Sequence, residues 1–387
     1  MASNHAASVR VVSAAEIDRH PAWRDCLAGQ RMDRRFFEVI HQTLTEGFEY
    51  HYFVLEDDAG AVAAIQPFFV LDQDLLAGTG RAIGRVVSLV RRVLPRFMFA
   101  RTLMVGCSAG EAHFDCATPQ HAAWIVTSLH RAIAEHAKRV GASLIVFKEF
   151  PAQYRPSMTT LTNDGYTRVP SLPMTRLSLD YASFDEFLAK GLSKSARRNV
   201  RRKIKAARNA PPLVMSVVED ATQWADEIYP LYLQVYDRSK MQFQRLTKDC
   251  LRVLGQRMPD KTRFFIWRQL GRVVAFGLCL AHGNALYDEY VGMDYSVALD
   301  QHLYFLTLYG ILGWAIEHGY KWYYSPSQGY DPKLHLGCEL VPLDLYVTHR
   351  SRVINFFLRR ILPHLEPTRS EPALKRFRNY HALWSDA

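Results

Sequence analysis

Residues 263–291 read RFFIWRQLGRVVAFGLCLAHGNALYDEYV, in which three runs rich in apolar side chains are separated by two short turns. Each turn contains a glycine, Gly271 or Gly283, which adopts the positive φ angles of tight hairpin turns without steric cost. The stretch therefore predicts three antiparallel strands in a meander. The sequence after it predicts a helix over 300–318 and strands over 321–324 and 340–348.

The first half of the chain repeats this order of elements. It predicts strands over 51–55, 61–71 and 101–105, a helix over 120–140 that opens at Thr118-Pro119, a strand over 143–147 and a closing strand within 165–179. Such a repeat indicates a duplicated unit. We therefore predict an α/β protein with mixed central sheets flanked by helices. Its lobes cover 1–180 and 181–349, and a basic amphipathic extension covers 350–387.

The charge of the chain favours partners that are negatively charged. The 387 residues carry a formal charge of +10, which suits phosphates, nucleic acid or an anionic lipid surface. The six cysteines have no C-x-x-C or metal-finger spacing, so we expect reduced thiols and no metal site. Residues 1–12 do not read as a signal peptide, and no apolar run reaches the ~20 residues that span a bilayer. These features predict a cytoplasmic protein, peripheral to the inner face of the membrane.

Two motifs in the second half point to a known family. Residues 192–204 read LSKSARRNVRRKI, and residues 329–333 read GYDPK, followed by Leu336-Gly337 and Glu339-Leu340. The first resembles the serine-lysine-arginine helix of FemAB-like and related N-acyltransferases, and the second resembles their closing motif. The resemblance implies a tandem GNAT-like (acyl-CoA N-acyltransferase) fold. One departure is that residues 296–303, where a glycine-rich pyrophosphate loop is expected, contain no glycine.

The resemblance also implies transfer of an acyl or aminoacyl group from a carrier to an acceptor. The co-substrate is then an acyl thioester of coenzyme A or acyl-carrier protein, or alternatively aminoacyl-tRNA, and no cofactor stays bound. Our first hypothesis is an N-acyltransferase that uses a thioester and an amine acceptor by direct attack. The alternatives are an aminoacyl-tRNA-dependent transferase and a non-catalytic adaptor that binds RNA or membranes.

Several side chains are candidates for this chemistry. Lys333, which matches the lysine of the resembled motif, is expected to neutralise developing negative charge, and Asp288 or Glu289 to accept a proton from the acceptor amine. Because these two carboxylates are adjacent on a predicted strand, only one of them faces the site. Tyr330, or else Tyr324, is a candidate proton donor, although each is also suited to core packing.

The donor is expected to bind at the opening of the helix predicted from Asp300. Free backbone N–H groups near Asp300, Gln301 and His302 can receive a phosphate or an oxyanion, unless Asp300 simply caps the helix. The helix over 190–208 carries nine Lys or Arg and no acid, and its Lys194, Arg197 and Arg201 are predicted to contact phosphates of the donor. The other interpretation of this helix is a solvated basic face.

Two further segments combine basic and apolar residues. Residues 81–101 contain six arginines and no acid, and residues 350–360 combine arginines with Phe356 and Phe357. Both predict helices that lie on an anionic bilayer, or else core helices with a charged rim. The run Gly106-Cys-Ser-Ala-Gly110 matches a serine-hydrolase elbow, but a helix does not begin directly after it, so we reject that interpretation.

Overall fold

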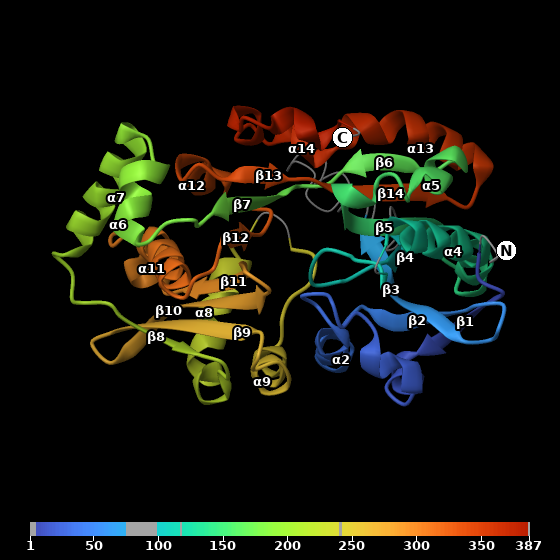
Figure 1. Cartoon of the computed structure of the whole chain (residues 1–387), viewed down its shortest axis with the longest axis horizontal. Helices are drawn as coiled ribbons and strands as arrows, with labels where there is room; N and C mark the ends of the chain where they lie inside the picture. The colour runs from blue at the N-terminus through green and yellow to red at the C-terminus, as the bar shows by residue number, and fades with distance from the viewer. Residues whose placement is uncertain (1–4, 75–98, 117, 240–241, 386–387) are drawn as a thin grey trace, which may run out of the picture. The chain divides into compact units, whose positions relative to one another are not determined.

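The computed structural model describes residues 5–74, 99–116, 118–239 and 242–385, and its elements are labelled in Figure 1. Of the segment 81–101, predicted as an interfacial helix, residues 81–98 lie outside these residues, and residues 99–101 begin a strand instead. The chain forms two compact units. The N-terminal unit contains 1–28, 40–171 and 343–367, and the C-terminal unit contains 29–39, 172–342 and 368–387. These ranges differ from the predicted boundaries, because each half of the chain contributes segments to the other unit.

The N-terminal unit contains a seven-stranded sheet in the order β1-β2-β3-β4-β5-β14-β6. Its strands are β1 (Ser8–Ser13), β2 (Glu49–Glu56), β3 (Val62–Asp74), β4 (Phe99–Val105), β5 (Leu144–Pro151), β6 (Thr167–Pro170) and β14 (Leu343–His349). Only the β4–β5 pair of this sheet is parallel. The predicted helix is α4 (Pro119–Arg139), which is capped by Thr118 and packs into the core through Ile125, Leu129 and Ile133.

The C-terminal unit repeats this arrangement. Its sheet has the order β8-β9-β10-β11-β12-β7-β13, and only the β11–β12 pair is parallel. The strands are β7 (Met174–Ser178), β8 (Val214–Val218), β9 (Thr262–Gln269), β10 (Arg272–His282), β11 (Ala285–Met293), β12 (Trp322–Ser325) and β13 (Glu339–Val341). The predicted meander over 263–291 is therefore confirmed as β9, β10 and β11, and the duplicated architecture with it.

The helices of the two units range from single turns to the 21 residues of α4. The main ones besides α4 are α2 (Arg34–Thr43), α7 (Lys194–Ala207), α8 (Ala225–Tyr236), α9 (Lys248–Arg257), α10 (Tyr295–Ala298), α11 (Leu303–Glu317), α12 (Tyr330–His335) and α13 (Arg352–Leu365). None of the helices within the described residues combines the length and the apolar character that crossing a membrane requires.

One strand of each sheet comes from the other half of the sequence. The predicted closing segment 165–179 divides into β6, which joins the N-terminal sheet, and β7, which joins the C-terminal sheet. The predicted strand over 340–348 likewise divides into β13 and β14, which belong to different sheets. Pro173 and Pro342 stand at these divisions, where a residue without a backbone N–H interrupts a strand ladder.

A close contact in the C-terminal unit requires a glycine in β11. A Cβ atom on Gly292 would lie 2.5 Å from the backbone nitrogen of Tyr232 in α8 and 2.3 Å from the ring of Phe276. The helix backbone is part of this contact, so side-chain rotation alone cannot relieve it. Gly292 therefore fixes how closely α8 approaches the strand that carries the site described below.

We expect Gly292→Ala to lower the free energy of unfolding by about 1–3 kcal/mol, because the added methyl group overpacks the contact. Thermal unfolding followed by circular dichroism measures the effect. Gly29→Ala is the matched control, because a Cβ at Gly29 meets nothing within 4 Å. Equal melting temperatures for the two variants would show that α8 moves away at little cost.

Candidate functional site

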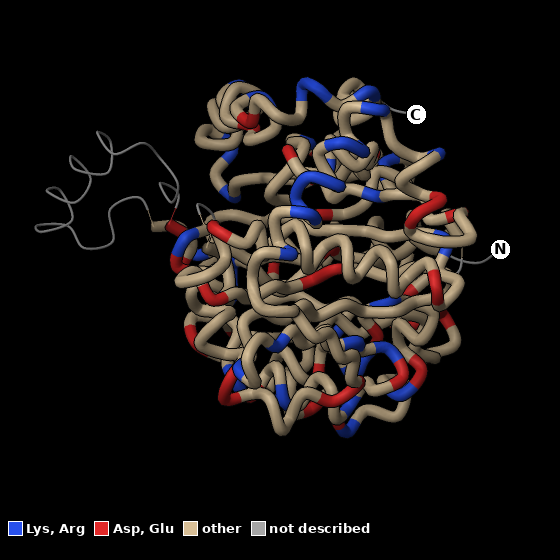
Figure 2. Tube along the Cα trace, turned by 90° about the vertical axis from the view of Figure 1, so that its left-hand side faces the viewer, with Lys and Arg blue, Asp and Glu red and all other residues tan. Residues whose placement is uncertain are grey.

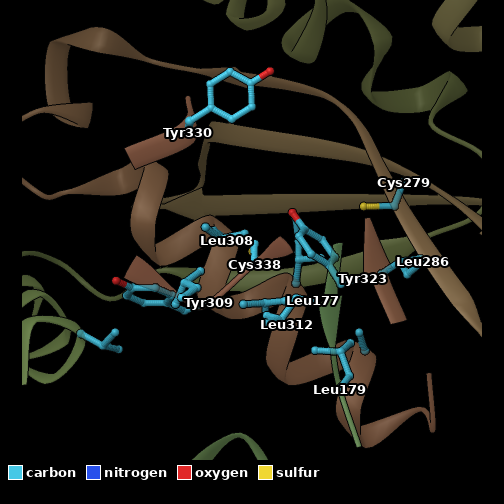
Figure 3. Close-up of a cluster of buried hydrophobic side chains, with 14 of the residues drawn as sticks. Leu177, Leu179, Cys279, Leu286, Leu308, Tyr309, Leu312, Tyr323, Tyr330 and Cys338 are labelled. Carbon is cyan, nitrogen blue, oxygen red and sulfur yellow. The ribbon is translucent and has the colours of Figure 1, made fainter. Parts of the chain in front are cut away.

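Asp288 lies where β11 and β12 stop pairing. Their parallel register covers three residue pairs and ends at Tyr287↔Tyr324. The buried Tyr323 hydroxyl donates a 2.7 Å hydrogen bond to Oδ2 of Asp288. Figure 3 shows the ring of Tyr323 close to Leu177, with its hydroxyl directed away from the leucines beneath it. Asp288 itself is half-buried, and Tyr323 anchors its carboxylate from the core side.

A β-bulge separates Asp288 from the neighbouring carboxylate. The register between β10 and β11 shifts at Leu278/Cys279, which leaves Glu289 as an extra residue in β11. Glu289 forms a buried ion pair with Arg31. Of the two carboxylates predicted as bases, Glu289 is therefore neutralised by a cation, whereas Asp288 accepts a hydrogen bond from a neutral hydroxyl.

Lys333 is the second charged group of this site. It lies in α12, which begins after Gly329, a residue with a left-handed φ of 61°. The side chain is buried, with 3% of its surface exposed, and Nζ donates to the carbonyl oxygens of Pro326 and, at 2.6 Å, Gln328. These two bonds use two of the three ammonium protons. The loop before α12 therefore holds the ammonium group in place.

Burial moves the pKa values of both groups toward neutrality. It raises the pKa of Asp288 to about 6, although the Tyr323 hydrogen bond and the charge of Lys333 oppose the shift. It lowers the pKa of Lys333 to about 8, although the charge of Asp288 opposes the shift. Burial disfavours the charged form of each group, and the opposite charge nearby favours it. At neutral pH the site therefore contains a carboxylate and an ammonium group that both exchange protons readily.

Tyr304 also borders this site. It lies in the first turn of α11, and burial, followed by the charge of Asp288, raises the pKa of its hydroxyl. A Cβ on Gly329 would lie 3.4 Å from that hydroxyl, so the loop before Lys333 and the start of α11 approach each other here. Tyr304 therefore provides a protonated hydroxyl near Asp288, beside the loop that holds Lys333.

The two predicted proton donors have other contacts, although the ring centroid of Tyr330 lies 5.9 Å from Nζ of Lys333. The hydroxyl of Tyr330 donates a 2.8 Å hydrogen bond to the carbonyl oxygen of Pro173, which ties α12 to the segment before β7. Tyr324 stacks on Tyr287 with 4.5 Å between ring centroids, and the guanidinium of Arg31 lies 4.1 Å from the ring of Tyr287. The alternation of side chains along β12 thus places Tyr324 with the Arg31 ion pair and Tyr323 with Asp288.

The predicted donor-binding residues near Asp300 precede a helix that begins later than expected. The helix starts at Leu303, and Asp300 is exposed in the turn between α10 and α11. His302 has a left-handed φ of 53°, which interrupts the helical conformation between these two helices. Gln301 exchanges two hydrogen bonds, of 2.9 and 3.2 Å, with the side chain of Gln269. Gln301 thereby ties this turn to the end of β9.

The basic helix α7 exposes most of its charges. Lys194 and Arg201 are exposed, whereas Nη1 of Arg197 donates a 2.9 Å hydrogen bond to the carbonyl oxygen of Ala189. Lys203 is buried instead, with its Nζ 3.1 Å from the centroid of the Phe305 ring in α11. The Lys and Arg positions are blue and the acidic positions red in Figure 2. One face of α7, including Lys203, therefore packs on the core, while most of the other cations of the helix face solvent.

Sequence reasoning missed four contributors to this region: Tyr323, Tyr304, Arg31 and Lys203. Arg31 lies 258 positions before its partner Glu289, so no local pattern reveals the pair. Tyr323 differs from a named candidate by one position, which changes the face of the strand. Across the described residues, no group of three or more His, Cys, Asp or Glu is placed to hold a metal ion.

Two sheets of the same strand order, each with one parallel pair followed by divergence, define a tandem GNAT-like fold. The chain belongs to the FemAB-like family, whose model, described as peptidoglycan biosynthesis/recognition, matches residues 112–369, two thirds of the sequence. The family model and the fold identify an acyl- or aminoacyltransferase. A comparison with curated proteins finds no match.

Solved structures share the fold at low sequence identity. One is the C-terminal domain of a protein assigned as a lysylphosphatidylglycerol synthetase from Agrobacterium fabrum, with 11% identity, a TM-score of 0.52 and coverage of 92% of this chain and 96% of that one. Another is FemX, with 11% identity, a TM-score of 0.52 and coverage of 87% and 96%. At this identity the likeness establishes the fold.

Replacing Tyr323 by phenylalanine removes the hydroxyl that stabilises the charged form of Asp288. We expect the pKa of Asp288 to rise above its present value of about 6, because burial then acts with less opposition. The pH dependence of the Asp288 carboxyl-carbon NMR resonance, assigned by its loss in Asp288→Asn, measures the shift. Tyr309→Phe is the control, because Tyr309 is buried in the same core without this contact. An unchanged pKa in Tyr323→Phe would contradict the proposed electrostatics.

Proposed function

We propose that the C-terminal unit transfers an acyl or aminoacyl group to an amine acceptor at Asp288 and Lys333. The observation that carries this proposal is a half-buried carboxylate, with a pKa raised to about 6, within range of the charge of a fixed, buried ammonium group. A general base works best when its pKa lies near the working pH. A positioned cation stabilises the oxyanion that forms when an amine attacks a carbonyl carbon.

The reaction proceeds by direct attack, without a covalent enzyme intermediate. Asp288 removes a proton from the acceptor ammonium group, directly or through water, and the resulting amine attacks the carbonyl carbon of the donor. The carbonyl oxygen becomes negative and interacts with the ammonium group of Lys333. The bond to the leaving sulfur or oxygen then breaks as the amide forms. Of the two protons that the acceptor loses, one ends on the leaving atom and the other reaches solvent through Asp288.

This assignment predicts a bell-shaped dependence of kcat/KM on pH. Activity rises as Asp288 loses its proton near pH 6 and falls as Lys333 loses its proton near pH 8. We expect Asp288→Asn to lower kcat by about 100- to 10,000-fold and to remove the acidic limb. We expect Lys333→Met to lower kcat by about 100- to 1,000-fold and to remove the basic limb.

Lys321→Met is the matched control for Lys333→Met. Lys321 lies in the same unit, where it forms an exposed ion pair with Asp180. Its replacement is expected to leave both limbs of the profile in place, because a surface ion pair contributes about 0–1 kcal/mol to stability. If Lys333→Met raised KM but left kcat and the basic limb unchanged, Lys333 would only organise the loop over 326–329.

Two observations favour aminoacyl-tRNA over an acyl thioester as the donor. The turn over 294–302 contains no glycine and carries Asp294 and Asp300, which disfavour a diphosphate at this position. The exposed cations of α7 instead suit a longer phosphate backbone. A thioester of coenzyme A or carrier protein remains the competing donor. The family description directs the search for an acceptor to amines of peptidoglycan precursors.

Neutralising α7 distinguishes the two donors. If charged tRNA is the donor, we expect Arg198→Gln/Arg201→Gln to weaken its binding and to reduce the slope of log K against log salt by about 1–2. Arg131→Gln/Lys138→Gln on α4 is the control, because both side chains are exposed cations on another helix. Filter binding over a salt series measures both variants.

The outcome also separates an enzyme from an adaptor. Stabilisation by an acyl thioester, with no effect of the α7 variant, would assign the thioester as donor. RNA binding that depends on α7, without transfer to any amine and without an effect of Asp288→Asn, would support the non-catalytic adaptor.

A further inference from the structure

Helix α13 exposes an apolar face that no described residue covers. Val353, Ile354, Phe356, Phe357, Ile361 and Leu365 are 49–69% exposed, and they are six of the eleven exposed large apolar side chains in the part of the chain that the structure describes. Ile354, Phe357, Ile361 and Leu365 repeat at helical spacing and form a single stripe. A concentration of this kind on one helix marks an interaction surface.

The side of α13 next to this stripe is firmly attached to the N-terminal unit. Leu358 and Leu362 pack against the core cluster formed by β3, β4, β5 and β14. Asn355 donates to the carbonyl oxygen of Gly165 at 2.9 Å and accepts from the backbone N–H of His349, also at 2.9 Å. Figure 1 shows α13 running beside β14 and β6. The exposed stripe is therefore held in place by packing of the adjacent side of the same helix.

The charged side chains of α13 itself are all positive. Arg352, Arg359 and Arg360 are exposed, and residues 350–365 contain no Asp or Glu. The guanidinium of Arg360 lies 3.5 Å from the centroid of the Phe356 ring, so a cation and an aromatic ring form one surface. A helix with an apolar stripe and a rim of arginines suits the interface of an anionic bilayer, which accepts both kinds of side chain.

We propose that α13 binds the surface of an anionic phospholipid bilayer and inserts Phe357 and Ile361 among the lipids. Charge selects this occupant. A second copy paired through the same face would place its own Arg360, which lies on that face against the ring of Phe356, near this arginine, without acids on either helix to balance the two. Residues 81–98 of the same chain are also basic and lack acids, so their charge does not complement the arginines of α13 either. The proposal is independent of the transfer chemistry.

Co-sedimentation with vesicles tests this surface. The full chain is expected to bind vesicles of phosphatidylglycerol and phosphatidylcholine, to bind pure phosphatidylcholine weakly, and to dissociate as salt increases. Phe357→Ser/Ile361→Ser is expected to lower binding at least tenfold, and Arg359→Gln/Arg360→Gln to lower it severalfold and to reduce its salt dependence. Leu270→Ser is the control, because Leu270 is an exposed leucine in the other unit.

Circular dichroism and light scattering complete the test, because all four substituted α13 side chains are exposed and their variants are expected to fold. Vesicle binding that the α13 variants leave unchanged would overturn the proposal, as would the absence of binding to anionic vesicles. A dimer in solution that Phe357→Ser/Ile361→Ser dissociates would also overturn it, by assigning the stripe to a second copy. Loss of vesicle binding with an unchanged mass and fold supports it.

Discussion

The parallel pairing of β11 with β12 ends after three residue pairs, and the organisation of the C-terminal unit follows from that early end. Beyond Tyr287 the two strands no longer hydrogen-bond to each other, so Asp288 stands at the opening rather than inside a continuous sheet. Strand β12 still reaches far enough to place the hydroxyl of Tyr323 on that carboxylate. The chain then leaves β12 through the loop whose carbonyl oxygens hold Lys333. The separation of β11 from β12 therefore also determines where the carboxylate of Asp288 and the ammonium group of Lys333 are placed.

The same arrangement costs folding stability at neutral pH. The folded-state pKa of Asp288, about 6, lies above its usual value of 3.8, so its contribution to stability is present at low pH and is lost as pH rises through 6. The folded-state pKa of Lys333, about 8, lies below 10.5, so its contribution is present at high pH and is lost as pH falls through 8. Between these values both groups are charged, and only their mutual attraction and hydrogen bonds offset the cost of burial. A site kept under this penalty is typical of function rather than stability.

Much of the fold was predictable because periodicity and turns are local. The meander, the helix α4 and the duplicated order all follow from patterns within about thirty residues. The exchange of β7 and β14 was not predictable, because strand alternation does not specify which sheet a strand joins. In the site, Asp288 and Lys333 were named from alternation and motif. The tyrosine partner of Asp288 was missed, because choosing Tyr323 instead of Tyr324 depends on a strand register that is known only once the strands are paired.

The duplication also explains why chemistry is expected in one unit only. In the N-terminal sheet the parallel pairs of β4 and β5 end at Val105↔Phe147, and the next residue of β4's chain is Gly106. A Cβ there would lie 2.6 Å from that of Ala112, and φ is 128°, so this position accepts only glycine. Gly106 is the counterpart of Asp288, and the N-terminal unit therefore has no side chain at the position of the proposed base in the C-terminal unit. Glu149, a carboxylate of the neighbouring strand β5, is paired with Lys148. The two sheets thus share their strand order, while the residue after the last parallel pair determines which of them has a carboxylate at the opening.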